Sequence, residues 1–350
     1  MNSAKKIAVN LKWVPAYLLR GQLSEREIKE QKHLILAVAD HFEPCYTGVF
    51  EKFQSVSEQV RLVREWAARY PSSADEWRDS DGQPFKHTYF YPAEHNHPEV
   101  IAALAEHCHA GWGELEIHLH HGILKPDTAE NTRQTLVAFR DELVRHGCLS
   151  HMDGETTPRY GFVHGNWTLA NFGKGRYCGV DSEMKILSET GCYADFTMPS
   201  GSSPTQSRTV NSIYWVCDDP LKPRSYDYGV PVKPGAPGKG DLLMITGPFG
   251  LRWAERLVPR VETGEIASQD LPSAYRIERW LELAPRLGND IFIKLYTHGA
   301  QDRNSTALLL EGGLDKLFTL LKETCHRHNH QLRYCSTWEM RQAVDAAARG

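Results

Sequence analysis

The stretch Gly113–Gly122, G-E-L-E-I-H-L-H-H-G, decides how this chain folds and where its chemistry lies. Polar and apolar residues alternate with a period of two, which is typical of a β-strand with one face packed under helices. The titratable side chains on the other face are Glu114, Glu116, His118 and His120. Two imidazoles two residues apart on a strand point the same way and can bind one divalent metal. A surface strand with two solvated histidines is the alternative interpretation.

Length and composition limit the classes of protein to which this chain can belong. The chain has 350 residues, enough for one large α/β barrel or two ordinary domains. Its hydrophobic content of 41% and charged content of 24% are those of a globular protein. The net charge is −4 with both signs interspersed, so no concentrated basic surface is available for a nucleic acid. We therefore expect a globular protein with no nucleic-acid partner.

The sequence also bears on the compartment of the protein and on the state of its cysteines. No window approaches the roughly 18 continuous apolar residues of a membrane-spanning helix. Residues 1–8 carry two lysines without an apolar run of signal-peptide length behind them. The sequence thus predicts a cytoplasmic protein with no membrane span. Eight cysteines are scattered singly without a C-x-x-C pair, which predicts free thiols and no zinc knuckle.

Strand-like and helix-like runs alternate along the chain. Residues 34–40, L-I-L-A-V-A-D, form the kind of apolar run seen in a parallel strand buried on both faces. Residues 55–70 have helical spacing, and Pro71 is expected to end that helix. Further strands are expected at 88–94, 114–120, 160–164, 192–197, 212–216, 242–246, 290–298 and 332–336, and further helices at 98–107, 127–146, 181–189, 273–287, 314–326 and 338–348.

This alternation favours parallel strands covered by helices, as a barrel or a doubly wound sheet. No G-x-G-x-x-G or Walker-A pattern follows any strand, which weakens the nucleotide-binding versions. Residues 218–240 are rich in proline and glycine and are expected to form a long loop excursion. Because polar residues end several strands, and such ends share one mouth in a barrel, we predict a single (β/α) barrel-like domain over residues 1–350. These strand-end residues are Asp40, Glu94, His120, His164 and His298.

The first cluster of candidate catalytic groups is D-H-F-E-P, residues 40–44, just past the first predicted strand. Asp40 could be a metal ligand or a general base, His41 a ligand, and Glu43 an acid, a base or a ligand. A turn cap by Asp40 and a salt bridge by Glu43 would account for either residue alone. Three such groups opposite the His-x-His strand favour a metal site.

The order of motifs resembles the polysaccharide deacetylase (NodB-homology) family. The segments that carry the resemblance are V-A-D-H-F-E-P (38–44), G-E-L-E-I-H-L-H-H-G-I-L (113–124), I-L-S-E-T-G-C-Y-A-D-F-T (186–197) and L-Y-T-H (295–298). The resemblance covers about residues 34–345. It implies an irregular (β/α) barrel of about seven parallel strands and a metal-dependent deacetylase. The pattern also resembles a group of bacterial proteins often associated with surface-polysaccharide genes.

Some family positions hold other residues here. The resemblance aligns the family's first metal histidine with His120, but Leu124 stands where the second would fall, so His118 is the expected substitute. The segment 161–167, G-F-V-H-G-N-W, replaces the family's R-P-P-Y-G motif. The expected ligands are therefore the two histidines with a third group from the first cluster, one of Asp40, His41 and Glu43. Zn²⁺ is the expected ion, and Co²⁺, Mn²⁺, Ni²⁺ or Fe²⁺ also suits such ligands.

Other polar residues near the predicted strand ends could bind substrate or move a proton. His164 and Asn166 can bind hydroxyl groups or an oxyanion, and the indole of Trp167 can stack on a sugar. A tight glycine turn with a buried tryptophan is the alternative for that segment. Glu94 could reach the same mouth, although a polar loop before a helix also explains it. His298, at a strand end, could protonate a leaving amine.

These observations predict a metal-dependent hydrolase that removes an acyl group, N-acetyl in the family it resembles, from a sugar or glycan precursor. Metal-activated water would attack the carbonyl group, a carboxylate at Asp40 or Glu43 would accept a proton, and His298 would return it. A metal-independent glycoside hydrolase or lyase is the first alternative, and a non-catalytic glycan-binding barrel is the second. The glycosidase would use a carboxylate pair across the mouth, drawn from Asp40, Glu43, Glu94 and Asp195.

Overall fold

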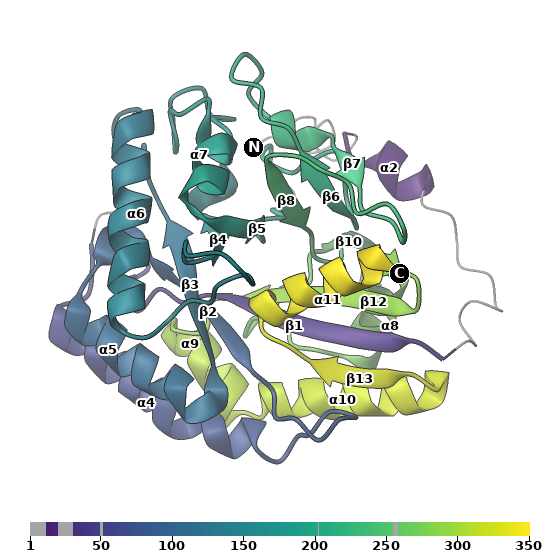
Figure 1. Ribbon diagram of the computed structural model, residues 1–350. Coiled ribbons are helices and arrows are strands. Elements are labelled where there is room, and N and C mark those ends of the chain that lie inside the picture. The colour runs from purple at the N-terminus through teal and green to yellow at the C-terminus, as the bar shows by residue number, and fades with distance from the viewer. Residues whose placement is uncertain (1–11, 20–30, 50–51, 202, 255–257) are drawn as a thin grey trace.

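The computed structural model describes residues 12–19, 31–49, 52–201, 203–254 and 258–350 (Figure 1). Residues 1–8, on which the expected absence of a signal segment rests, lie outside this part of the chain. The described residues form a mixed α/β fold around one large, mostly parallel sheet.

The strands expected from the sequence are all present, with ends within a few residues of those expected. They are β1 (His33–His41), β2 (His87–Pro92), β3 (Gly113–Leu119), β4 (Tyr160–His164), β5 (Cys192–Asp195), β6 (Ile213–Val216), β8 (Leu242–Ile245), β12 (Asp290–Thr297) and β13 (Gln331–Tyr334). The sequence did not predict two short strands and a separate hairpin. These are β7 (Val230–Pro231), β11 (Arg286–Leu287) and the pair β9 (Gly250–Ala254) and β10 (Val258–Glu262).

The expected helices are present as well. They are α4 (Val56–Ala74), α5 (Pro98–His107), α6 (Ala129–Arg145), α7 (Glu183–Thr190), α8 (Ala274–Leu283), α10 (Gly313–His328) and α11 (Thr337–Arg349). Two short helices were not expected, α2 (Val14–Leu19) and α9 (Asp302–Ser305). The expected stop at Pro71 was wrong, because α4 continues through it to Ala74. Pro71 lacks the N–H that would donate one backbone hydrogen bond, and α4 still continues for three residues beyond it.

A run of parallel strands dominates the sheet, in the order β12, β1, β2, β3, β4, β5 and β8. Strand β13 also pairs in parallel with the first half of β1. Parallel strands joined by helical crossovers place their carboxyl ends along one edge of the sheet. The residues that end β1, β3 and β4 therefore lie at one common edge, as the sequence predicted.

The predicted irregular barrel of about seven parallel strands is confirmed only as a mixed α/β fold with a large, mostly parallel sheet, because the sheet does not close among the described residues. Strand β6 adds antiparallel to β8 and is followed by β7, while β11 adds antiparallel to β12 at the other edge. The segment 218–240, expected as a loop excursion, supplies β7 at one of these edges. Antiparallel strands at both edges leave β7 and β11 unpaired with each other, so the ring of parallel strands stays open.

Both faces of the sheet are covered. Leu34, Leu36 and Val38 of β1 pack into the core beneath the helices, whereas Ile35 and Ala37 join a second apolar cluster with α11. Figure 1 shows α4 beside α5 on one side of the sheet and α11, in yellow, crossing its other face. This double burial explains the continuous apolar run at residues 34–40.

Strand β3 keeps the alternation that its sequence predicted. Leu115, Ile117 and Leu119 lie in the core under the helices. The polar side chains therefore face away from the helices, with the glutamates at the start of the strand and the histidines at its end. Among the described helices, none is both long and apolar enough to cross a membrane.

Candidate active site

A cavity of about 540 Å³ lies at the carboxyl ends of the parallel strands. This volume is within the range of pockets that bind small molecules. Besides two tyrosines, its titratable lining residues are His41, Glu43, Cys45, Glu94, His95, His118, His120, His164 and His298. Its aromatic lining residues are Tyr46, Phe53, Trp167 and Tyr177. The cavity thus combines imidazole and carboxylate groups with flat apolar surfaces.

Three side chains in this cavity could hold a metal ion: Glu43, His118 and His120. Oε1 of Glu43 lies 3.5 Å from Nε2 of His118 and 3.2 Å from Nε2 of His120. The two histidines come from the end of β3, and Glu43 from the loop that follows β1. Two imidazoles and one carboxylate with an open side are typical of a catalytic metal site.

The other ring nitrogen of each histidine is held by a second group. Nδ1 of His118 donates to the carbonyl oxygen of Val163 at 2.8 Å. Nδ1 of His120 lies 2.6 Å from Oε1 of Glu94, whose Oε2 accepts the backbone N–H of His120 at 3.1 Å. Because a carbonyl oxygen only accepts, Nδ1 of His118 carries a hydrogen, and Nε2 is the atom that faces Glu43. Such outer contacts orient the histidine ligands of metal sites.

The backbone after β4 leaves room for one of these rings. A Cβ atom on Gly165 would lie 2.3 Å from Cδ2 of His120, closer than real atoms approach. Any larger residue at position 165 would therefore displace the imidazole. The glycine of the H-G-N-W segment is thus required by the packing of His120.

The charges of nearby groups shift the pKa values of Glu43, His118 and His120. Burial alone would raise the pKa of Glu43, but the hydrogen bond with His118 and the charges of His120 and His118 lower it to about 2. Burial and the charge of His120 lower the pKa of His118. Burial would also lower the pKa of His120, but the charge and hydrogen bond of Glu94 raise it. Glu43 is therefore ionised at neutral pH, as a metal ligand must be.

Asp40 lies outside this group. The sequence left the carboxylate ligand open between Asp40 and Glu43, and only Glu43 is close to the histidines. Asp40 is fully buried, its Oδ2 lies 2.9 Å from Nε2 of His87, and its Oδ1 accepts the backbone N–H of Gly299 at 2.7 Å. A Cβ atom on Gly299 would collide with this carboxylate. Asp40 therefore joins β1 to the turn after His298 and has no oxygen free for an ion.

His41 and His298 face each other in the cavity. Their ring centroids are 4.9 Å apart, and the ring of His41 is 5.1 Å from that of His118. Burial, with the charges of His298 and His118, lowers the pKa of His41 well below its ordinary value. Nδ1 of His298 lies 3.8 Å from Oε1 of Glu265. Both rings lie beside the three-residue group without belonging to it.

The H-G-N-W segment divides between two environments. Asn166 is exposed at the cavity, and Trp167 lines it with an indole N–H that is buried and has no partner among the described residues. His164 touches the cavity, but its Nε2 lies 2.8 Å from Oε1 of Glu183 and its Nδ1 lies 2.5 Å from the carbonyl oxygen of Gly165. Both nitrogens of His164 are thus engaged, which leaves Asn166 and Trp167 as the free donors of the predicted wall.

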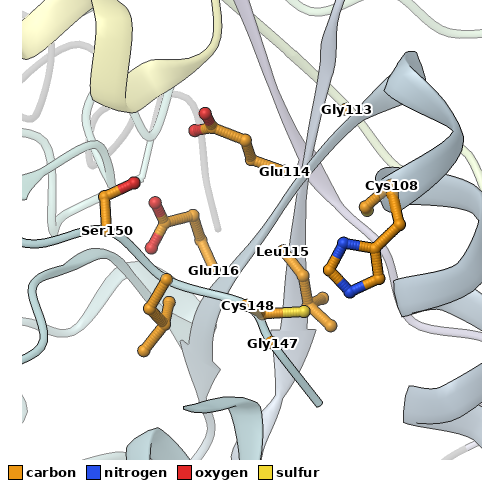
Figure 2. Close-up of a pocket in the computed structure, with 10 residues that line it drawn as sticks. Cys108, Gly113, Glu114, Leu115, Glu116, Gly147, Cys148 and Ser150 are labelled. Atoms are coloured by element: carbon orange, nitrogen blue, oxygen red, sulfur yellow. The ribbon is translucent and has the colours of Figure 1, made fainter.

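A second, smaller cavity of about 150 Å³ lies at the opposite end of β3. Figure 2 shows the carboxylates of Glu114 and Glu116 pointing into it on the same side as Ser150. Glu116 is buried and accepts hydrogen bonds from Tyr193 Oη at 2.7 Å and from the backbone N–H of Gly161 at 2.6 Å. The polar face of β3 therefore contributes to both cavities. Its glutamates have a structural role at the smaller cavity, and its histidines reach the active-site cavity.

The half-buried Glu114 makes stability depend on pH. Burial raises the pKa of Glu114 to about 7, the nearby charge of Glu339 adds to this, and Ser336 and Lys86 oppose it. Between pH 4.5 and 7 the folded state therefore holds a proton that the unfolded state has lost, so stability falls as pH rises through this window. We expect Glu114→Gln to stabilise the protein at pH 8 by about 2 kcal/mol relative to its effect at pH 4.5, as measured by urea unfolding at both pH values.

The matched control is Glu106→Gln, at an exposed position on α5. This variant should change the free energy of unfolding equally at the two pH values. A difference between Glu114→Gln and the wild type that does not vary with pH would contradict the assignment of a protonated Glu114.

Comparisons with known proteins add little to this description. No family model matches the chain, and no curated protein matches its sequence. Among solved structures, an alpha-mannosidase from Enterococcus faecalis V583 matches 90% of this chain with 10% identity and a TM-score of 0.39. The match covers 29% of the mannosidase chain, so this chain spans less than a third of that protein. A similarity of this strength carries no argument about activity, and the function rests on the site itself.

Proposed function

We propose that this protein is a metal-dependent hydrolase that removes an acyl group, N-acetyl in the first instance, from a sugar or glycan precursor. One observation carries the proposal. Glu43, His118 and His120 converge in a cavity with their side-chain atoms within 4.8 Å of one another, and the cavity leaves one side of the group open. A closed set of ligands would favour a structural ion, whereas an open one favours catalysis.

A divalent ion held by these three residues supplies Lewis-acid activation of water and of the substrate carbonyl group. The surrounding residues then orient the substrate and move protons. Glu94 holds His120 in place through its Nδ1 atom. His41 lies beside the ligands and is the group placed to accept a proton from the attacking water. His298, which faces His41 and lies next to Glu265, is placed to donate a proton to the leaving amine.

The lining of the cavity supports a sugar as the substrate. The flat face of Trp167 can pack against the C–H surface of a sugar ring, and its unpartnered N–H can donate to a hydroxyl or carbonyl oxygen. Apolar side chains also lie exposed at the cavity, namely Tyr46, Val49, Phe53 and Ile123. This apolar rim fits a substrate that carries an apolar part, such as a lipid-linked sugar, better than a bare oligosaccharide.

The geometry weighs against the metal-independent glycosidase. Asp40 and Asp195 are both fully buried, and neither lines the cavity. Glu43 and Glu94 do line it, but histidines lower the pKa of both carboxyl groups. A glycosidase needs one carboxylic acid with a raised pKa to protonate its leaving group. These two glutamates are instead ionised and paired with imidazoles, as in a metal site.

The test is a comparison of metal-loaded and chelator-treated protein on acylated sugars. Suitable probes are N-acetylglucosamine oligosaccharides, O-acetylated sugars and a lipid-linked N-acetylated sugar. Acetate release and the formation of new reducing ends would be measured in the same reactions. We expect acetate release that disappears on chelation and returns with Zn²⁺ or Co²⁺, without new reducing ends.

Three outcomes would contradict the proposal. If metal-free protein kept full activity, Glu43 and the two histidines could not be ligands of a catalytic metal ion. New reducing ends without acetate would identify a glycosidase. Binding of a probe without turnover, unchanged in His118→Ala and His120→Ala, would instead identify a glycan-binding protein.

A further inference from the structure

A second group of metal-ligating side chains lies buried next to the active-site cavity and has no part in the proposed reaction. Its members come from four places: the residue after His120, the end of β4, the loop that follows, and the first residue of α7. Their side-chain ligand atoms all lie within 4.8 Å of one another, and all four residues are buried. They are His121, His164, Cys178 and Glu183.

We propose that these four residues bind a second metal ion, a zinc ion of the structural type. Nε2 of His121 lies 3.1 Å from Nε2 of His164, and Oε1 of Glu183 lies 2.8 Å from each of these nitrogens. Ligand atoms about 2.0–2.1 Å from a tetrahedral zinc ion stand about 3.3 Å from one another. The observed spacings are close to those of ligands around one such ion.

The outer contacts of the two rings fix which nitrogen faces inward. Nδ1 of His164 meets the carbonyl oxygen of Gly165, which can only accept. Nδ1 of His121 lies 2.8 Å from Oδ2 of Asp127, a carboxylate oxygen that accepts hydrogen bonds. Each Nδ1 therefore carries a hydrogen, and both Nε2 atoms face the same carboxylate oxygen. The rings meet that oxygen through their own protons, or through one cation that takes the place of those protons.

Backbone groups also hold the cysteine and the glutamate. Sγ of Cys178 accepts the backbone N–H of Val180 at 3.4 Å and lies 3.6 Å from the carbonyl oxygen of Val180. Oε2 of Glu183 accepts the backbone N–H of Ala170 at 2.6 Å, which leaves Oε1 for the ion. Two nitrogens, one sulfur and one oxygen complete four-coordination. This burial leaves no open position for a substrate, so the site is structural.

The loop between β4 and α7 shows what such an ion would do. Within it, Asn166, Trp167, Ala170, Asn171, Lys174 and Tyr177 all have positive φ angles between 49° and 60°. Each costs free energy that the surroundings must supply. The loop also carries Trp167 and Tyr177 of the active-site cavity. An ion bound to Cys178 and Glu183 on one side and to His121 and His164 on the other would fix this strained wall to the sheet.

The backbone beside the site allows the loop to lie close to the end of β3. Gly122 has a φ of +63°, and a Cβ atom there would lie 1.9 Å from the carbonyl oxygen of Cys178. The carbonyl oxygen of Gly122 also accepts the N–H of Tyr177 at 2.8 Å. The H-L-H-H-G stretch therefore contributes to both sites: His118 and His120 face the cavity, while His121 and Gly122 hold the loop.

Cobalt spectroscopy separates this site from the active site, because only this group contains sulfur. Protein produced in zinc-depleted medium with Co²⁺ should show a sulfur-to-cobalt charge-transfer band and about two metal ions per chain. Cys178→Ala should lose the band and about one ion, whereas Glu43→Gln should keep the band and lose the other ion. The exposed Cys217 is the matched control, and Cys217→Ala should keep both.

The result that overturns the proposal needs no variant. Wild-type cobalt protein without the charge-transfer band would show that the four residues form a hydrogen-bonded cluster only. A band that persists in Cys178→Ala, or that disappears in Cys217→Ala, would also overturn it. Because the proposal concerns this loop and not the reaction, the band is expected whether or not the protein releases acetate.

Discussion

Replacing Glu43 by glutamine should abolish hydrolysis while leaving the fold intact. The amide is a poor ligand for a divalent ion, and it removes the negative charge that both histidines face at 3.5 Å and 3.2 Å. We expect kcat/KM to fall by about 10³-fold or more, equivalent to about 4 kcal/mol of transition-state stabilisation. The measurements are acetate release and metal content, together with circular dichroism to confirm folding.

Glu94→Gln provides a graded comparison. Glu94 acts through His120 and does not belong to the three-residue group, so its loss should reduce metal affinity or activity by about 10- to 100-fold. The exposed Glu99→Gln on α5 should change neither. If Glu94→Gln were as damaging as Glu43→Gln, or if Glu43→Gln kept its metal and its activity, the ligand assignment would be wrong.

Much of the fold could be predicted because local patterns encode it. The alternation in β3 and the apolar run of β1 placed both strands and their buried faces correctly. Closure of the barrel could not be predicted, because it depends on which strands meet at the edges. The edge strands β7 and β11 are two residues long and carry no periodicity of their own. A resemblance between sequences likewise cannot show that the edges meet.

The candidate site, like the fold, could be predicted from the sequence only in part. His118 and His120 could be identified together, since a strand with period two brings them to one face. The choice of Glu43 over Asp40 could not, because only two residues separate them and the turn after β1 decides which one reaches β3. The second site was missed altogether. Its thiol and carboxylate come from Cys178 and Glu183, more than fifty residues after His121, and single cysteines gave no motif.

One signal in the sequence did point to the second site. Two histidines in succession, His120 and His121, cannot both point to the same face of a strand. The second must therefore face a different environment from the first. The glycine that follows permits the positive φ with which the chain leaves the strand. A histidine doublet before a glycine at a strand end thus favours two sites, not one.

Replacing Glu262 by alanine should cause the largest loss of stability of any single carboxylate in the described part of the chain. Glu262 is fully buried and binds Arg276 through both oxygens, with Oε1–Nη2 and Oε2–Nε distances of 2.7 Å and 3.0 Å. Arg252 lies 3.1 Å away on the same carboxylate. The alanine variant would leave the buried guanidinium of Arg276 with only Asp270, whose Oδ1 lies 3.6 Å from Nη1, as a counter-charge, at a cost of about 3 kcal/mol or more. Urea unfolding at pH 7 measures this difference.

The effect should depend on pH in a defined direction. Burial would raise the pKa of Glu262, but Arg276 lowers it below its ordinary value of 4.5. The carboxylate therefore stabilises the fold above that value and loses its contribution as pH falls through the lowered pKa, so the wild type and the variant should converge in acid. Glu58→Ala, which removes an exposed partner of Arg61 on α4, is the control and should leave the unfolding midpoint unchanged.

The consequence for the active site follows from the path of the chain after Glu262. The backbone N–H of Gly264 donates to the Glu262 carboxylate at 3.0 Å, and Glu265 then pairs with Tyr296 of β12 next to His298. In folded Glu262→Ala protein, Glu265 would be less firmly held beside His298. Proton donation to the leaving group should then weaken, so kcat should fall while metal content stays at the wild-type level. A variant that loses metal in proportion to activity would show instead that the damage reaches Glu43 and the two histidines.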